Sequence, residues 1–320
     1  MKGLYHLCYT SHSEVICRNN NDYERLVCRI AQTSISTASQ VLAYAIMSTH
    51  IHLIILTDSP SDFLKRLRHS YTTSFNHKYF RKGTLGEKNY YGKRLKGIEH
   101  ITAAISYVLR NPVHHNVATN PFSYPYSTAN LYFRSDLEKI VNEVSYGNTM
   151  FKRIDIARKN WNNSEGLYRK AVCLKGKISF LDTGGVDPLS FVEVGMVESY
   201  FGTYNAYQFN LHRRDYQDWE RYQLESDTDE SPITIASIEP WMDQKQVADF
   251  EKKPSRWYKE EQISDMELCS EIDKEILRLH KSSYVHLSRE EKIAISAKIR
   301  MQHPYAIKSE QFARCFGGWN

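Results

Sequence analysis

The stretch "AIMSTHIHLIIL", residues 45–56, places two histidines one residue apart inside an apolar run. On a β-strand, residues i and i+2 project to the same face, so His50 and His52 would point together while Ile51 turns away. Two imidazoles arranged in this way can bind one divalent cation. The alternative is a pair of half-buried histidines bonded to the backbone, because a chain with 13 histidines produces this spacing readily by chance.

The stretch "AAISYVLRNPVHHNV", residues 103–117, adds a phenol and an amide at helical spacing. Tyr107 and Asn111 lie four residues apart and would share one face of a helix, which we expect to stop at Pro112. A phenol can act as a nucleophile once it is activated, and an amide oxygen can bind a cation. Without such chemistry, the tyrosine would be core filler and the amide a helix cap.

The elements that must position these residues can be predicted from hydrophobic periodicity. Alternation predicts strands at 3–10, 40–47, 50–58 and 89–95, and helical spacing predicts helices at 19–36, 59–80 and 98–110. In the helix at 59–80, Ser59 would be the N-cap, and an apolar stripe is made by Phe63, Leu67, Tyr71 and Phe75. This order predicts an α+β fold with a ferredoxin-like antiparallel sheet covered by helices.

The charge is distributed unevenly along the chain. Residues 1–135 contain 7 Lys and 9 Arg against 7 Asp and Glu, a net charge of +9, whereas the whole chain carries +5. The remainder is therefore acidic. This asymmetry indicates that the first part of the chain meets a polyanion, although a merely basic domain would have the same charge.

The composition is that of a globular protein, with 41% hydrophobic and 25% charged residues. No run approaches the roughly 18 apolar residues that a membrane span needs, and the N-terminus has no secretory signal pattern. The six cysteines form no Cys-x-x-Cys pair, which favours reduced thiols in a cytoplasmic protein over a zinc cluster. A length of 320 residues allows more than one domain.

We predict three regions: a domain at 1–135, an accessory region at 136–236, and a helical region at 237–320. The accessory region ends in an acidic linker, "ESDTDESP" at 225–232. Near the C-terminus, Ser288 and Glu291 predict a capping box. Residues 290–302 and 309–316, with a turn at Pro304, could form the first two helices of a helix-turn-helix or a small helical packing unit.

Residues 1 to about 133 resemble the single-tyrosine HUH transposases, specifically the REP-associated tyrosine transposases of insertion-sequence type. "AIMSTHIHLII" resembles their metal-binding strand, "YVLRNPVHHNV" their nucleophile helix, and "NPFSYPYST" the tail of that domain. Thr49 departs from the family, which usually has Asn there, and "GTLGEKNYY" lacks the usual Trp-Gln. The resemblance implies an HUH endonuclease domain, followed here by a largely helical extension.

The resemblance also implies roles for the residues of the two motifs. His50, His52 and Asn111 would hold Mg²⁺ or Mn²⁺, and Tyr107 would be the nucleophile. Imidazoles also suit zinc, so the identity of the metal depends on the resemblance. The implied function is a DNA transposase that cleaves and joins single-stranded DNA bearing REP-like hairpins, through a 5′-phosphotyrosine intermediate and a free 3′-OH.

Basic and aromatic residues between the two motifs are the candidate DNA contacts. The cations could bind phosphates, and six aromatic side chains among them could stack on unpaired bases: Tyr71, Phe75, Tyr79, Phe80, Tyr90 and Tyr91. The predicted DNA-binding cations are Lys65, Arg66, Arg68, Lys78, Arg81, Lys82, Lys93, Arg94 and Lys96.

Two other functions are compatible with parts of this pattern. A domesticated protein could bind DNA hairpins without cutting them, but such a protein would not need all of His50, His52, Tyr107 and Asn111. A replication initiator of the wider HUH group more often carries a Lys or a second Tyr on the nucleophile helix, which "YVLRNPV" lacks. The residues do not decide between a monomer and a homodimer.

Overall fold

The computed structural model of the chain describes residues 2–11, 13–87, 90–115, 117–136, 178–179, 181, 185–212, 263–303 and 307–319. The predicted acidic linker at 225–232 and the turn at Pro304 lie outside the described residues. The five described cysteines are all buried, and none of them forms a disulfide.

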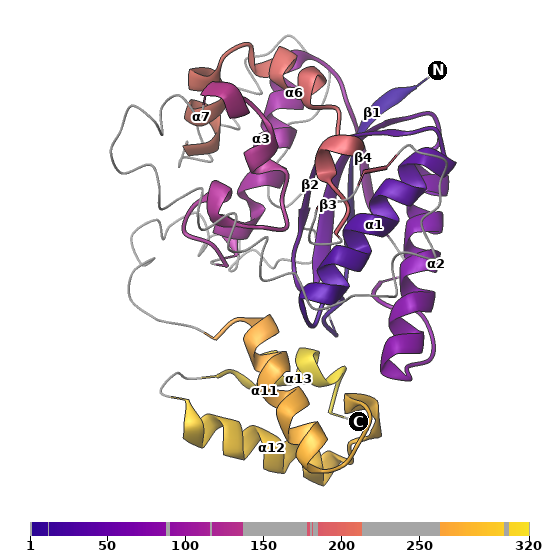
Figure 1. Cartoon of the computed structure of the whole chain (residues 1–320), viewed down its shortest axis with the longest axis vertical. Coiled ribbons are helices and arrows are strands. Elements are labelled where there is room, and N and C mark those ends of the chain that lie inside the picture. The colour runs from indigo at the N-terminus through magenta and orange to yellow at the C-terminus, as the bar shows by residue number, and fades with distance from the viewer. Residues whose placement is uncertain are drawn as a thin grey trace.

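Four strands form one antiparallel sheet, as predicted (Figure 1). They are β1 (Gly3–Thr10), β2 (Gln40–Ile46), β3 (His50–Thr57) and β4 (Tyr91–Leu95), in the order β2-β3-β1-β4. Together with α1 (Asn20–Ser36) and α2 (Pro60–Tyr79), the chain runs β-α-β-β-α-β. This is the ferredoxin-like plan, which confirms the α+β fold class predicted from the sequence.

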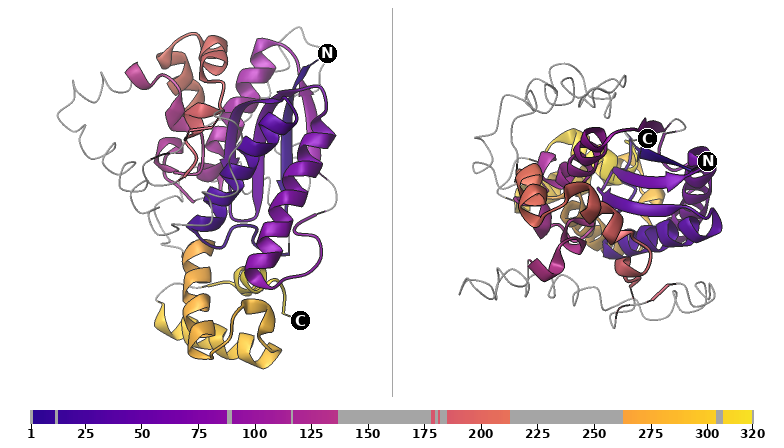
Figure 2. Two further views of the ribbon diagram at one scale, coloured as in Figure 1. Left: turned by 45° about the vertical axis from the view of Figure 1, so that its right-hand side comes forward. Right: turned by 90° about the horizontal axis from the view of Figure 1, so that it is seen from above.

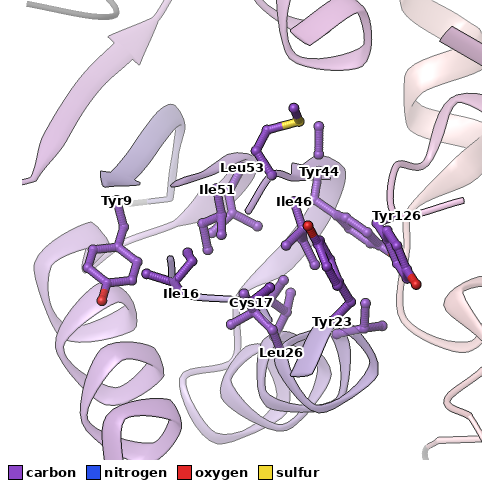
Figure 3. Packing of buried hydrophobic residues seen from close by; sticks show 14 of the residues in the cluster. Tyr9, Ile16, Cys17, Tyr23, Leu26, Tyr44, Ile46, Ile51, Leu53 and Tyr126 are labelled. Atoms are coloured by element: carbon purple, nitrogen blue, oxygen red, sulfur yellow. The ribbon is translucent and has the colours of Figure 1, made fainter. Parts of the chain in front are cut away.

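Alternate residues of the strands serve two different faces of the sheet. Leu53 and Ile51 of β3, with Tyr9 of β1, lie in an apolar core that also contains Leu26 of α1 (Figure 3). The four predicted stripe residues of α2 (Phe63, Leu67, Tyr71 and Phe75) are all buried in the same core. The hydrophobic effect therefore fixes α1 and α2 on this face.

The opposite face of the sheet is covered by α3, which spans Ile98–His114. We predicted that this helix would stop at Pro112, and this prediction is wrong, because Pro112 lies inside the helix. A proline within a helix removes one hydrogen bond, and here the loss falls in the last turn, where Pro112 and Val113 are buried. Asn111 therefore belongs to the helix and is not its cap.

A second pair of helices packs beside α3: α6 (Val194–Phe201) and α7 (Tyr204–His212) (Figure 1). Tyr207 is fully buried, and its hydroxyl donates to the carbonyl of Ala129 at 2.8 Å. Glu198 accepts a hydrogen bond from the backbone N–H of Phe133 at 2.6 Å. These contacts tie residues 185–212 to the end of the first 135 residues.

The described residues 263–303 and 307–319 contain mostly helices, as predicted for the last part of the chain, and lie at one end of the sheet (Figure 2). It contains α11 (Asp265–Arg278), α12 (Arg289–Gln302) and α13 (Ser309–Phe316). The capping box of Ser288 and Glu291 is present. Among the described residues, no helix combines the length and apolar character that crossing a bilayer requires. The boundaries of the three predicted regions stay predictions.

The C-terminal helices are joined to the first domain through a buried charge. Arg18 is almost completely buried, and its Nη2 donates to Asp273 Oδ1 of α11 at 2.7 Å. Its Nη1 donates to the carbonyl of Cys315, and its guanidinium lies 4.2 Å from the centroid of the Tyr284 ring. A buried guanidinium needs such partners, because desolvation of an unpaired charge is costly.

We expect the Asp273→Ala substitution to lower the free energy of unfolding by about 3 kcal/mol, because it leaves Arg18 buried without its carboxylate. Urea denaturation measures the change. The double variant Arg18→Met, Asp273→Ala should be more stable than the single variant, since it removes the charge together with its partner. A single variant as stable as the unsubstituted protein would contradict this account.

Candidate functional site

The two histidines of β3 point to the face of the sheet that α3 covers. His50 Nε2 lies 2.9 Å from Asn111 Oδ1 of α3, so the strand and the helix are in direct polar contact. The ring centroids of His50 and His52 are 5.1 Å apart, and both side chains are buried. The prediction that the two imidazoles share one face is therefore confirmed.

Tyr107 lies on the same side of α3 as Asn111. The centroid of its ring is 5.5 Å from that of His52, and the two rings meet edge to face. Tyr107 is 7% exposed, and Asn111 is fully buried. The structure thus brings together the two pairs of residues that the sequence placed on separate elements, although their chemical roles stay predictions.

Three further histidines adjoin the site, and sequence reasoning missed them. His6 of β1 has its ring 6.1 Å from that of Tyr107, and its Nε2 lies 3.1 Å from His52 Nδ1. His114 of α3 has its ring 5.4 Å from that of Tyr107, and His115 has its ring 4.7 Å from that of His50.

The spacing of one of these histidines contained a usable signal. His114 follows Tyr107 by seven residues, so helical periodicity places it near the same face of α3. His6 gave a weaker signal, because its position beside the site depends on the pairing of β1 with β3, in which Cys8 is opposite His52. Strand pairing between segments so far apart cannot be derived from local periodicity.

The donor set at the centre of the site fits a divalent cation. Two imidazoles and one carboxamide oxygen lie close together, and all three are buried and uncharged. Imidazoles suit first-row metals, and a carboxamide oxygen also suits Mg²⁺ and Mn²⁺. Asn111 lies in the last turn of α3, where the helix dipole favours positive charge. Among the described residues, no group of three or more His, Cys, Asp and Glu side chains could hold a metal ion, so a site here depends on Asn111.

Three of the nine predicted DNA-binding cations hold the domain together. Arg81 pairs with Glu14, and Lys78 Nζ lies 2.6 Å from Asp22 Oδ1. Arg68 donates to the carbonyl of Glu87, and its guanidinium lies 4.9 Å from the centroid of the Tyr9 ring. These side chains are partly buried, and each binds another part of the first domain.

The other six cations lie at or near the surface. Arg66 is exposed and pairs with Asp62 one helical turn away, at 2.8 Å. Lys93 is half-buried and is opposite His6 in the β1–β4 register, so its side chain projects toward the α3 face. The remaining four side chains are exposed: Lys65, Lys82, Arg94 and Lys96.

The expectation that six aromatic residues stack on bases is wrong for half of them. Tyr71, Phe75 and Tyr79 are buried in the core between α1 and α2. Burial and the neighbouring Asp22 carboxylate raise the pKa of Tyr79 well above its usual range, and its hydroxyl donates to Asp22 Oδ2 at 2.7 Å. Of the other three, Phe80 is 60% exposed, and Tyr90 and Tyr91 are half-buried.

No protein-family model matches the chain, and no curated protein matches it. One similar solved structure is that of a REP-associated tyrosine transposase bound to a REP hairpin, with 16% identity and a TM-score of 0.36. The matched region covers 43% of this chain and 81% of the transposase chain. Another is a crystal structure of a candidate transposase from Deinococcus radiodurans R1, with 18% identity and a TM-score of 0.27, which covers 35% of this chain and 91% of its own.

The ion pair of Arg81 yields a stability prediction with a matched control. Arg81→Met leaves Glu14 nearly buried without its partner, so we expect the free energy of unfolding to fall by about 1 to 3 kcal/mol. Lys65→Met on the exposed side of α2 should change it by less than about 0.5 kcal/mol. Urea denaturation compares the two. Equal effects would show that the buried ion pair contributes no more than an exposed lysine.

Proposed function

We propose that the protein is a transposase of the single-tyrosine type, which cleaves and rejoins single-stranded DNA with the help of a divalent cation. The observation that carries the proposal is the convergence of His50 and His52 of β3 with Tyr107 and Asn111 of α3. A phenol beside a set of metal-ligating side chains is the arrangement that metal-assisted attack on a phosphodiester requires.

In the proposed reaction, Tyr107 Oη forms a bond to the phosphorus atom and gives up its proton. The bond between phosphorus and the 3′ oxygen breaks, and that oxygen leaves with a proton as a 3′-OH. The product is a 5′-phosphotyrosine, which keeps the phosphodiester bond energy. A second 3′-OH can then attack the phosphorus and release Tyr107, so strands are joined without ATP.

The surroundings of Tyr107 support its role as the nucleophile. A phenol with its usual pKa near 10 needs a proton acceptor before it attacks. His114 is not one of the proposed ligands, and its ring centroid lies 5.4 Å from that of Tyr107, so its imidazole is the candidate proton acceptor. When bound by His50, His52 and Asn111, Mg²⁺ or Mn²⁺ would withdraw charge from the phosphate oxygens.

The substrate in this proposal is single-stranded DNA that carries hairpins. The surface cations described above would neutralise its phosphates, and the exposed ring of Phe80 can stack on an unpaired base. Arg68, Lys78 and Arg81 contribute less, because their charges already have partners within the domain.

We expect the Tyr107→Phe substitution to abolish a covalent protein–DNA adduct while leaving DNA binding unchanged. The assay incubates the protein and its variant with single-stranded DNA carrying a hairpin, in the presence of Mn²⁺, and separates adducts on a denaturing gel. Binding is measured in parallel by fluorescence anisotropy.

The matched control for this assay is Tyr90→Phe, which removes a half-buried hydroxyl outside the site. It should keep the adduct. Equal binding by both proteins without an adduct in either would instead support a non-cleaving hairpin-binding protein. An adduct that persists in Tyr107→Phe would exclude Tyr107 as the nucleophile.

A separate prediction tests the cations. The double variant Lys65→Met, Lys82→Met should bind single-stranded DNA less tightly and with a weaker dependence on salt, because two phosphate contacts are removed. For single strands the slope of log affinity against log salt concentration should shrink by about 1.4. The single variant Lys78→Met should leave the slope unchanged, because Lys78 is paired with Asp22. Equal slopes for all three proteins would show that neither Lys65 of α2 nor Lys82, which follows α2, contacts a DNA phosphate.

A further inference from the structure

We propose that His6 and Thr49 are positioning residues, which hold the imidazoles of His52 and His50 with their Nε2 atoms toward the cation. The inference rests on the proposed metal site and assigns a role to two residues outside its ligand set. Both imidazoles have a polar partner at Nδ1, and in both cases the distance is 3.1 Å. A partner at one ring nitrogen fixes the orientation of a histidine ring and leaves the other nitrogen for a cation.

The contact between His52 and His6 allows two placements of the ring hydrogen. If Nδ1 carries the hydrogen, it donates to His6 Nε2, and His52 Nε2 keeps a lone pair for the cation. If His6 Nε2 donates instead, His52 Nε2 carries the hydrogen and faces Cys8 Sγ at 4.0 Å. Only the first arrangement leaves a lone pair of His52 for a cation, so a cation bound at Nε2 would keep the hydrogen on Nδ1, where His6 Nε2 accepts it.

Thr49 can serve His50 both with and without a cation. In the metal-free protein, its hydroxyl can donate to His50 Nδ1 while His50 Nε2 donates to Asn111 Oδ1 at 2.9 Å. When Nε2 binds a cation, the hydrogen moves to Nδ1, and the hydroxyl rotates to accept it. A hydroxyl is suited to this because it both donates and accepts. His50 Nδ1 thus has a hydrogen-bond partner both with and without a cation at Nε2.

The position of His6 argues for a supporting role and not for a ligand. Its ring is fully buried, and its Nε2 already contacts His52. The β1–β3 register fixes Cys8 opposite His52 and Thr10 opposite His50, which brings His6 beside His52 on the α3 face. The ring is further confined by the rings of Tyr91 and Tyr107, with centroids 5.4 and 6.1 Å away. Such packing limits the orientations that its nitrogen can take.

The test compares two pairs of variants in the full-length protein. His6→Leu and Thr49→Val remove the polar partner at Nδ1 and keep similar bulk, whereas His6→Gln and Thr49→Ser keep an acceptor. Mn²⁺ affinity is measured by electron paramagnetic resonance without DNA. We expect His6→Leu and Thr49→Val to bind Mn²⁺ about 10-fold to 100-fold more weakly, and His6→Gln and Thr49→Ser to bind it within about 3-fold of the unsubstituted protein.

A second measurement uses the unsubstituted protein loaded with Mg²⁺ and does not depend on the folding of any variant. Two-dimensional ¹H–¹⁵N correlation spectra of the imidazoles identify which nitrogen of His52 carries hydrogen. We expect Nδ1. Hydrogen on Nε2 would overturn the role of His6.

The outcomes separate this inference from the proposed function. If the unsubstituted protein binds Mn²⁺ and both His6→Leu and Thr49→Val bind it equally well, the two residues are not positioning residues, and the proposed function stands. If the unsubstituted protein binds no Mn²⁺, the proposed metal site itself is wrong. Loss of Mn²⁺ affinity in His6→Leu and its recovery in His6→Gln, with matching thermal stability, would support the inference.

Discussion

The contact between His50 Nε2 and Asn111 Oδ1 joins a strand and a helix across 61 residues of chain, and the site depends on it. This contact requires that polar side chains be buried between α3 and a sheet that is otherwise apolar. Such groups are tolerated in a core only when they are hydrogen-bonded, because desolvation of an unsatisfied polar atom is costly. The contacts of His52 with His6 and of His50 with Thr49 meet that requirement. The polar partners of the two proposed ligands are therefore part of what lets their imidazoles be buried.

The geometry of the site further depends on helices far away in the sequence. The carbonyl of Ser48, in the turn that leads into His50, accepts the backbone N–H groups of Ile16 and Cys17. The Ser48 hydroxyl donates to Asp265 Oδ2 at 2.8 Å, and Asp265 also binds Arg314 of α13. Through Asp265, α11 and α13 hold the turn that sets the direction of β3. The C-terminal helices thus brace the strand that carries both histidines.

Local periodicity predicted most of the fold and the centre of the site. The period of a strand placed His50 and His52 on one face, and the period of a helix placed Tyr107 with Asn111. Features that depend on contacts between distant segments of the chain could not be predicted in this way. His6 joins the site only through the register of β1 with β3. Lys78 and Arg81 looked like DNA contacts because their partners, Asp22 and Glu14, lie 56 and 67 residues away. The sequence predicts that α3 ends at Pro112, but Pro112 lies in the last turn of this helix. A sequence alone does not show the packing around a proline in that position.

The candidate site and the apolar core lie on opposite faces of the sheet, because side chains alternate between the two faces along each strand. Tyr9, Ile51 and Leu53 face α1 and α2, where the core is apolar and the nearby charges are paired. Their immediate neighbours His50 and His52, with His6 on β1, face α3. Shifting β1 by one residue against β3 would exchange the faces of its side chains, burying His6 in the apolar core and moving Tyr9 toward α3. The hydrophobic cost of that exchange enforces the correct register, so the apolar face of the sheet determines where the imidazoles lie.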